Sequence, residues 1–290
     1  MYATGMVGRT WLATRLMRRP YVAKIAADAA FERAQRRGLA EGELADFQQG
    51  GGGIAPRLLR AVRNRSVRDA AAVACPSSFM RDLAVSWGVE PSHVFVLPNP
   101  APAVGDAERA SEPERRPLLA FTGRLTAQKD LGVALEALAE LPDATLVLAG
   151  DGGERGRLEA AAARLGVSDR AHFLGPLPRA QALGLLATAD VAVLSSAWEN
   201  FPHGVIEALT MGTPVIATRV GGVPEIVRDG ENGLLVEPGD PIALAAAIRR
   251  FLDDTELRDR LEAAAASSVE RFSADRVYGE LESILLEAAG

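Results

Sequence analysis

Short apolar runs alternate with helical segments across residues 118–236, and this alternation restricts the fold more than any other feature of the sequence. Each run has the length of a buried strand, and each intervening segment has the length and apolar spacing of a helix. Such an order predicts right-handed βαβ units that build a parallel, doubly wound sheet. We expect its strands at 118–121, 144–149, 171–174, 191–194, 215–218 and 233–236, and helices at 131–141, 154–165, 179–188, 202–211 and 224–228.

The segment before residue 100 shows a less regular version of the same pattern. Prolines and charged residues then dominate 100–117 without an apolar period, which indicates a linker. In the first segment we expect strands at 21–25, 71–75 and 94–97 and helices at 5–18, 56–69 and 79–87. The expected organisation is α/β, with a domain at 1–105, a linker at 106–117, a second domain at 118–270, and a C-terminal helix at 271–290 that packs back on the first domain.

The bulk composition excludes several classes of protein. A chain of 290 residues with 48% apolar residues is large enough for two domains of ordinary size. The single cysteine, Cys75, excludes an intrachain disulfide framework, and its apolar surroundings predict a buried strand end in a reducing compartment. No apolar stretch approaches the ~18 residues that span a bilayer, and the first residues lack the order of a signal peptide. We therefore expect a cytoplasmic protein.

The net charge of −6 is unevenly distributed along the chain. Residues 1–70 contain 13 basic and 6 acidic side chains, whereas residues 71–290 contain 19 basic and 32 acidic ones. A basic first part fits an anionic partner such as a phospholipid surface or a phosphorylated acceptor. The segment 6–19 also mixes apolar and arginine side chains, as membrane-surface helices do. Solvated helix faces and packing on a sheet explain both features as well, so peripheral membrane contact is one of two alternatives.

The sequence Gly123-Arg124-Leu-Thr-Ala-Gln-Lys129 follows the first strand of the second domain and precedes a helix. Both cations can therefore reach a diphosphate near the start of that helix, where free backbone N–H groups also favour anions. One arginine can bind two phosphate oxygens at once, and lysine acts as a compact positive charge. Because the chain has 30 arginines and only two lysines, Lys24 and Lys129, a lysine at this position is informative. A solvated helix start with an exposed cation pair is the alternative.

Two glutamates lie shortly after a later predicted strand. Glu199 follows the apolar run 191–194, and Glu207 lies within the apolar helix expected next. Both are expected beside the crevice at the carboxyl ends of the strands, where open α/β sheets bind ligands. Helical spacing places His203 on the same face as Glu207. A carboxylate in an apolar helix needs partners, and sugar hydroxyls are suitable donors. A salt bridge to a core arginine is the alternative for Glu207.

Glycines and prolines mark the loops around these groups. Pro202 suits the first turn of its helix, and Gly204 lets a ligand approach the backbone closely. Gly221 and Gly222 precede Pro224, so they predict a flexible loop followed by a new helix start that would face anions. Ordinary turn chemistry explains these loops as well.

No motif indicates a metal or a cofactor. The histidines lack ligand spacing, and no Asp-x-Asp sequence follows a strand. Nothing matches a P-loop or a nucleophile elbow. We expect no metal, no cofactor and no nucleic-acid partner.

Taken together, the motifs occur in the order typical of the GT4-type retaining glycosyltransferases, which the chain resembles. The resemblance is strong over residues 118–270 and looser over 1–100. It implies a GT-B fold, which consists of two Rossmann-like, doubly wound parallel-sheet domains with a nucleotide sugar between them. The segments that carry it are Gly123-Arg124…Lys129, Gly150-Asp151-Gly152, Phe173-Leu-Gly175, Glu199 to Glu207 with Glu-x7-Glu spacing, Gly221-Gly222-Val-Pro224-Glu225, Asn232-Gly233-Leu-Leu-Val236 and, in the first part, Lys24…Asp28, Pro76-Ser77-Ser78 and Val96-Leu-Pro98-Asn99.

The resemblance also implies roles for individual residues. Arg124 and Lys129 would bind the diphosphate of an NDP-sugar donor and, with Glu199, would form the catalytic group. Glu199 would bind hydroxyls of the donor sugar, and Glu207 would bind the ribose hydroxyls. Transfer would retain the anomeric configuration, need no metal, and use a carbohydrate, lipid-linked or small-molecule acceptor. The other donor-binding residues would be Gly123, Gly175, Leu177, Arg179, Phe201, Pro202, His203, Gly204, Val205, Gly221 and Gly222, with 175–179 bordering the base.

The front of the chain departs from the family pattern. The family's acceptor domain opens with a strand, a glycine-rich turn and a helix, whereas Met1-Tyr-Ala-Thr-Gly resembles the middle of that domain. We therefore expect an incomplete N-terminal domain, with Ala26 where many members carry a histidine. Three functional hypotheses stay open. They are a retaining glycosyltransferase, a truncated and catalytically impaired homologue that binds a nucleotide sugar or a partner, and a sugar-nucleotide epimerase on the same fold.

Overall fold

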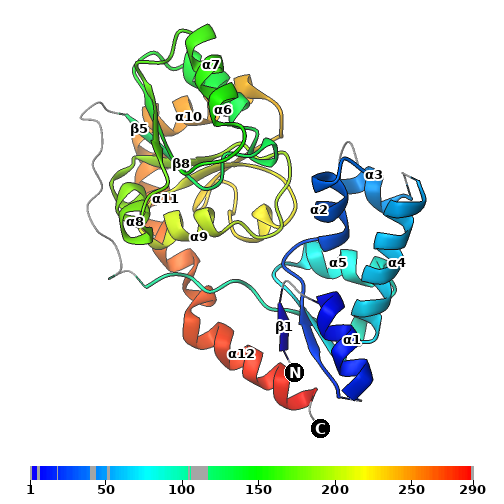
Figure 1. Cartoon of the computed structure of the whole chain (residues 1–290). Helices are drawn as coiled ribbons and strands as arrows, with labels where there is room; N and C mark the ends of the chain where they lie inside the picture. The colour runs from blue at the N-terminus through cyan, green and yellow to red at the C-terminus, as the bar shows by residue number, and fades with distance from the viewer. Residues whose placement is uncertain are drawn as a thin grey trace. The chain divides into compact units, whose positions relative to one another are not determined.

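The computed structural model describes residues 2–4, 7–17, 19–39, 44–50, 53–103, 105 and 117–288. The chain forms two compact units (Figure 1). Unit 1 comprises Met1–Asn99 together with Asp275–Gly290, and unit 2 comprises Pro100–Ala274. The linker predicted at 106–117 lies outside the described residues, apart from Pro117.

Unit 2 contains a six-stranded parallel sheet in the order β10-β9-β8-β5-β6-β7. This is the strand order of a Rossmann sheet, in which the first and fourth strands of the unit are neighbours. All residues of β6, β8 and β9 are buried, as expected of parallel strands covered on both faces. The strands are β5 (Leu118–Thr122), β6 (Thr145–Ala149), β7 (Ala171–Gly175), β8 (Val191–Leu194), β9 (Val215–Thr218) and β10 (Gly233–Val236).

Helices cover both faces of this sheet (Figure 1). One face carries α6 (Leu131–Ala139), α7 (Arg155–Arg164) and α10 (Pro241–Asp253), and the other carries α8 (Arg179–Thr188), α9 (His203–Thr210) and α11 (Thr255–Ser268). Asp240 caps α10 by accepting a 2.8 Å hydrogen bond from the Ala243 N–H, with Pro241 at the first helical position. The described part of the unit also contains the 3₁₀ turns η3 (Ala127–Lys129), η4 (Val223–Glu225) and η5 (Glu270–Phe272).

The predicted helix at 224–228 is wrong, because only the single turn η4 forms there. The fully buried Asn232 side chain forms hydrogen bonds with backbone groups that would otherwise pair within a longer helix. It accepts from the Arg228 N–H at 2.7 Å and donates to the Ile226 carbonyl at 3.0 Å. The loop after β9 therefore lacks the helix start that was expected to face anions.

Unit 1 contains a four-stranded parallel sheet in the order β1-β2-β3-β4. One face packs against α1 (Val7–Met17), α4 (Ile54–Arg68) and α5 (Ser78–Ser86) through a cluster that includes Val67, Met80 and Trp87. The opposite face packs against α12 (Ala274–Glu287), where Val277 and Ile284 contact strand residues. The strands are β1 (Tyr2–Thr4), β2 (Val22–Lys24), β3 (Ala72–Cys75) and β4 (Val94–Val96).

Among the described elements of unit 1, four are absent from the sequence predictions: β1, α2 (Ala29–Arg36), α3 (Leu44–Gln48) and the 3₁₀ turn η1 (Pro91–His93). A strand of three residues is too short to show an apolar period. α2 is rich in charge and begins at Asp28, whose carboxylate accepts hydrogen bonds from the Ala30 and Phe31 N–H groups. Cys75 is confirmed as a buried residue at the end of β3, and burial raises its pKa to about 12.

Within the described residues, no helix has both the length and the apolar character needed to cross a membrane.

Candidate active site

The segments that follow β5 and β8 meet at the switch point of the unit 2 sheet. β5 and β8 are adjacent, yet the chain leaves them in opposite directions along the sheet, toward β6 and β9. In open α/β sheets, ligands bind at such a point, outside the carboxyl ends of the strands. Gln128 joins the two segments here. Its carbonyl accepts from the Ala197 N–H at 2.9 Å, and its side-chain amide donates to the Trp198 carbonyl at 2.9 Å.

Lys129 and Glu199 form an ion pair across this point. The Lys129 side chain is 15% exposed and the Glu199 side chain 6%, so both charges are largely withdrawn from water. The Ser196 hydroxyl donates to the same Glu199 oxygen, Oε1, at 2.7 Å. Among the described residues, Oε2 has only one contact, at 3.5 Å with the Gln128 amide. Glu199 is therefore held firmly through Oε1, whereas Oε2 keeps capacity to accept another hydrogen bond.

Arg124 lies on the exposed side of the same loop. With the residues that the structure describes, its side chain makes no hydrogen bond and no ion pair. It is therefore a cation available to an anionic ligand. Lys129 sits in η3, one residue before the N-cap of α6, so the structure brings a free guanidinium, an ammonium and a helix start onto one loop.

Asp130, the N-cap of α6, has a left-handed backbone with φ of 42°, and it is the one non-glycine residue with positive φ in the described part of the chain. Such a conformation costs roughly 1–3 kcal/mol and is concentrated at functional sites. Burial, with Glu136 nearby, raises the pKa of Asp130, and Arg157 partly offsets this effect. The strained residue directly follows Lys129, so it helps to fix where that lysine leaves the backbone.

The loop after β9 packs against the backbone of Glu199. The Gly222 N–H donates to the Glu199 carbonyl at 3.4 Å. Gly221 has φ of 51°, and a Cβ at this position would lie 1.6 Å from the same carbonyl oxygen. Only glycine fits at 221, because any side chain would displace either this loop or Glu199. The structure thus places Gly221 and Gly222 against Glu199.

Glu207 and Arg179 lie together at a second place on this edge of the sheet. Arg179 is the first residue of α8, and its guanidinium lies 3.8 Å from the Glu207 carboxylate on α9. The Arg179 side chain is 64% exposed, so this pair is a loose surface contact and not a bridge to a core arginine. Gly175 ends β7, and its carbonyl accepts from the Gly150 N–H at 2.8 Å. Leu177 is half-buried between Gly175 and Arg179.

In the segment from Phe201 to Val205, His203 at the start of α9 is exposed, whereas Phe201, Pro202 and Val205 are buried. A ligand at this segment could therefore contact mainly its backbone. The Phe201 ring is buried edge-on against Phe272, 5.3 Å away between centroids. Pro202 is the N-cap of α9 and not its first helical residue. A Cβ on Gly204 would lie 3.1 Å from the Thr122 carbonyl, so α9 begins close to the end of β5.

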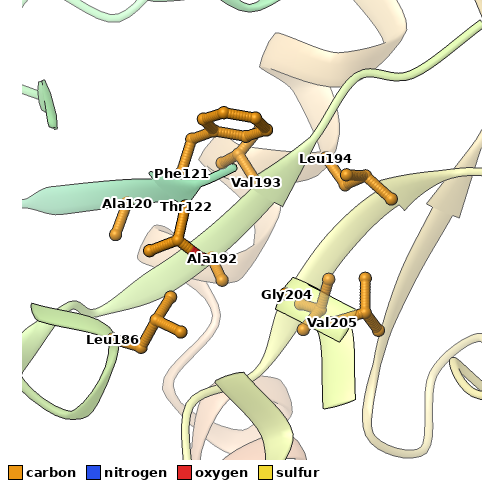
Figure 2. Close-up of a pocket in the computed structure, with 10 residues that line it drawn as sticks. Ala120, Phe121, Thr122, Leu186, Ala192, Val193, Leu194, Gly204 and Val205 are labelled. Atoms are coloured by element: carbon orange, nitrogen blue, oxygen red, sulfur yellow. The ribbon is translucent and has the colours of Figure 1, made fainter. Parts of the chain in front are cut away.

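A cavity of about 10 Å³ lies beneath this point, between β5, β8 and the start of α9. Figure 2 shows Phe121, Val193 and Leu194 on the strands and Gly204 and Val205 on the helix around it. The cavity is apolar and far smaller than a sugar. It is therefore a packing gap under the site and not a ligand pocket.

Sequence patterns missed three residues of this arrangement: Ser196, Gln128 and Asp130. A serine next to a strand end and a glutamine in a turn are common and carry no distinctive spacing. Gln128 contacts Trp198 across 70 residues of chain, the Ser196 hydroxyl reaches Glu199 only in the folded loop, and Asp130 is distinguished by its backbone angle. None of these features is visible in a sequence. No three metal-ligating side chains gather in the described part of the chain.

The geometry agrees with what comparison with known proteins finds. The model of a family described as "Glycosyl transferases group 1" matches residues 106–268, more than half of the chain. The chain belongs to this glycosyl transferase family. A second model, "Glycosyl transferase 4-like domain", matches residues 1–100. The resemblance to GT4-type glycosyltransferases is therefore confirmed.

Two curated relatives illustrate this glycosyl transferase kinship. The lipopolysaccharide core biosynthesis glycosyltransferase LpsE of Rhizobium meliloti is 39% identical over 156 residues, which cover 54% of this chain and 45% of LpsE. The D-inositol 3-phosphate glycosyltransferase of Corynebacterium glutamicum is 34% identical over 231 residues, which cover 72% of this chain and 55% of that enzyme. The chain spans about half the length of these relatives.

Solved structures of glycosyl transferases share the fold. HepE of Anabaena, solved in complex with UDP-glucose, superposes with a TM-score of 0.80 at 24% identity. The superposition covers 98% of this chain and 78% of HepE. The predicted GT-B fold class, with two parallel-sheet α/β domains, is confirmed.

Proposed function

We propose that this chain carries the donor site of a glycosyltransferase that moves a sugar from an NDP-sugar to an acceptor with retention of the anomeric configuration. The observation that carries the proposal is the pairing of Lys129 with Glu199 at the switch point of the unit 2 sheet. One of these groups suits a diphosphate and the other suits sugar hydroxyls. HepE was solved with UDP and with UDP-glucose, which supports an NDP-sugar as the donor class.

In this proposal the diphosphate binds beside Arg124, Lys129 and the start of α6. The guanidinium can hold two phosphate oxygens, the ammonium adds a compact positive charge, and backbone N–H groups at the helix start supply further donors. These groups stabilise negative charge on the departing diphosphate, which is the largest contribution to the rate that we expect. We propose that no metal is needed for this stabilisation.

The donor sugar then lies at Glu199 and the nucleoside near Glu207. Glu199 Oε2, which has only a 3.5 Å contact with the residues that the structure describes, accepts a hydrogen bond from a sugar hydroxyl. Glu207 accepts the ribose hydroxyls, and residues 175–179 border the base. Gly204 lies against the Thr122 carbonyl and Gly221 against the Glu199 carbonyl, so both positions need glycine for these close approaches. In the proposal, the backbone at Gly204, Gly221 and Gly222 borders the sugar.

Donor binding requires an exchange of partners at Lys129. The ammonium that pairs with Glu199 in this structure turns to the diphosphate, and Glu199 turns to the sugar. In the reaction, the anomeric carbon exchanges its bond to a diphosphate oxygen for a bond to the acceptor oxygen on the same face. The proton of the acceptor hydroxyl leaves with the diphosphate, so charge and atoms balance.

The test is a panel of NDP-sugars incubated with the chain, with an alcohol acceptor and without one. We expect release of NDP from at least one donor, in the presence of EDTA as well as Mg²⁺, and a product whose anomeric configuration by NMR matches that of the donor. Binding of NDP without any turnover would favour the alternative, an impaired homologue that only binds nucleotide sugars. An inverted product would overturn retention.

We also propose that α1 contacts an anionic membrane surface. Leu12, Leu16 and Met17 are 55%, 78% and 62% exposed, and the exposed Arg9 and Arg15 lie on the same helix. In vesicle flotation, the chain should rise with vesicles that contain phosphatidylglycerol, and L16S/M17S should remain below. The matched control I54S removes an apolar residue that is 86% exposed on α4, and it should float like the unaltered chain. Equal flotation of all three proteins would contradict the proposal.

A further inference from the structure

A cleft of about 190 Å³ opens in unit 1, at the edge of the sheet opposite to the carboxyl ends of the strands. Tyr21 directly precedes β2, and Asp69 lies at the end of α4, before β3, so both mark the amino edge of this sheet. All the lining residues belong to unit 1, whereas the proposed donor site lies in unit 2. The residues that line the cleft are Trp11, Thr14, Arg15, Arg19, Tyr21 and Asp69.

Hydrogen bonds fix the two aromatic side chains of this cleft. The Trp11 indole N–H donates to Asp69 Oδ2 at 2.8 Å, and the Tyr21 hydroxyl donates to the Ser66 carbonyl. Burial, with Asp69 nearby, raises the pKa of Tyr21, so its hydroxyl stays neutral. The Thr14 hydroxyl donates within α1, to the Thr10 carbonyl at 2.9 Å. The rings of Trp11 and Tyr21 therefore supply apolar wall, and their polar atoms are already paired.

The charges of the cleft leave one cation without an anion. Asp69 Oδ2 also accepts from Arg65 at 3.1 Å and lies 3.5 Å from the Arg15 guanidinium, so two cations share this carboxylate. The Arg19 backbone N–H donates to the Thr14 carbonyl at 3.0 Å, which ties Arg19 to the end of α1. Its exposed side chain makes no hydrogen bond and no ion pair with the residues that the structure describes. The cleft therefore has an excess of positive charge.

The volume of the cleft limits what can fill it. A water molecule takes up about 30 Å³ of the liquid, so the cleft has room for roughly six. It is too large for a lone inorganic anion to fill, and it is smaller than the ~300 Å³ at which pockets for drug-sized ligands begin. Arginine can bind both oxygens of a carboxylate, and a planar ring packs well against aromatic side chains. A single ring that carries a carboxylate matches both the size and the chemistry.

We propose that this cleft binds a small aromatic carboxylate. The carboxylate pairs with Arg19 and Arg15, and the ring lies against Trp11 and Tyr21. A neutral ring would leave Arg19 without an anion, and a lone anion would leave the aromatic wall in contact with water, so both parts of the ligand contribute. The basic character of residues 1–70 favours the approach of an anion. The site is independent of the proposed donor function, because none of its residues takes part in donor binding.

The experiment uses the presence of only three tryptophans in the chain. Incorporation of 5-fluorotryptophan into the full chain gives three ¹⁹F signals, of which W11F and W198F assign two. The probes, at constant ionic strength, are benzoate, benzyl alcohol, acetate, inorganic phosphate and phosphatidylglycerol vesicles. Benzoate should shift the Trp11 signal saturably and leave the Trp198 signal unchanged. Benzyl alcohol, acetate and phosphate should each bind at least roughly tenfold more weakly, because each lacks either the charge or the ring.

Benzoate binding should weaken by roughly tenfold in R19M, since a charge-assisted hydrogen bond is lost. The matched control R57M removes an exposed guanidinium of α4 that does not line the cleft, and it should bind benzoate like the unaltered chain. Both changes are at exposed side chains, so both variants should fold.

Three results would each overturn the inference. The first is a Trp11 signal that ignores benzoate or follows acetate and phosphate equally, which would indicate a general ion effect. The second is equal weakening of benzoate binding in R19M and R57M, which would reduce the effect to net charge. The third is a Trp11 signal that follows the vesicles and not benzoate, which would assign the cleft to a membrane-contacting surface of α1.

Discussion

The ammonium of Lys129 and the carboxylate of Glu199 pair with each other although 70 residues separate them in the chain. The first follows β5 and the second follows β8, and these two strands are neighbours only because of the Rossmann strand order. The structure therefore holds an ammonium and a carboxylate in mutual contact. In the proposed donor complex these two groups separate, so that the diphosphate and the sugar would be recognised together.

The pair itself should be detectable in the stability of the fold. K129M should lower the free energy of unfolding by roughly 3 kcal/mol, because it leaves the buried Glu199 charge uncompensated. The double variant K129M/E199Q should recover most of this loss. Urea denaturation measures both values. A double variant as unstable as K129M would show that the two side chains are not coupled.

Glu199 should matter for transfer and not for nucleotide binding. E199Q should reduce the turnover of an NDP-sugar by roughly 10- to 100-fold, since it removes a charged acceptor of a sugar hydroxyl. NDP should bind at least as tightly as to the unaltered chain, because Lys129 no longer has to leave Glu199. Steady-state kinetics and calorimetry with NDP measure the two effects. Unchanged turnover would remove Glu199 from the site.

Ser196 should act by positioning Glu199. S196A deletes the 2.7 Å hydrogen bond to Oε1 and should reduce kcat by up to roughly tenfold, with little change in the affinity for NDP. S267A is the matched control, because the exposed Ser267 hydroxyl donates to the Ala264 carbonyl at 3.2 Å and to nothing else among the described residues. A decrease in NDP affinity with kcat unchanged would assign Ser196 to the nucleotide instead.

Gly221 should tolerate no side chain. G221A places a Cβ against the Glu199 carbonyl in a left-handed conformation, so it should destabilise the fold by at least about 2 kcal/mol and reduce turnover. G156A in α7 meets no atom within 4 Å and should stabilise the fold by up to about 1 kcal/mol. Thermal unfolding compares the two variants. Equal melting temperatures would show that the loop moves away without cost.

Much of the fold could be predicted because it depends on local pattern. The strands of unit 2 are short apolar runs, and the helix at 179–188 has the predicted bounds. The same pattern placed Glu199 and Glu207 at the carboxyl ends of the strands, where the candidate site lies, although the strand order itself was not predicted. The family resemblance then assigned chemistry to Lys129, Glu199 and their neighbours.

What sequence could not provide depends on contacts between distant segments or on backbone geometry. The Lys129–Glu199 pair, the hydrogen bond from Ser196 and the close approach of Gly221 to Glu199 each need the folded sheet. The single turn η4 in place of a helix depends on Asn232, four residues beyond the last residue of the predicted helix. β1 has too few residues to show any period.

The most direct test of the central claim is the affinity for nucleoside diphosphates. Calorimetry on the full chain should show one of UDP, GDP and ADP binding at a single site. K129A should weaken that binding by roughly tenfold or more and leave the affinity for the parent nucleoside unchanged. R164A, which removes an exposed charge from α7, should bind like the unaltered chain. The account is contradicted if no diphosphate binds, or if K129A weakens nucleoside and diphosphate binding equally.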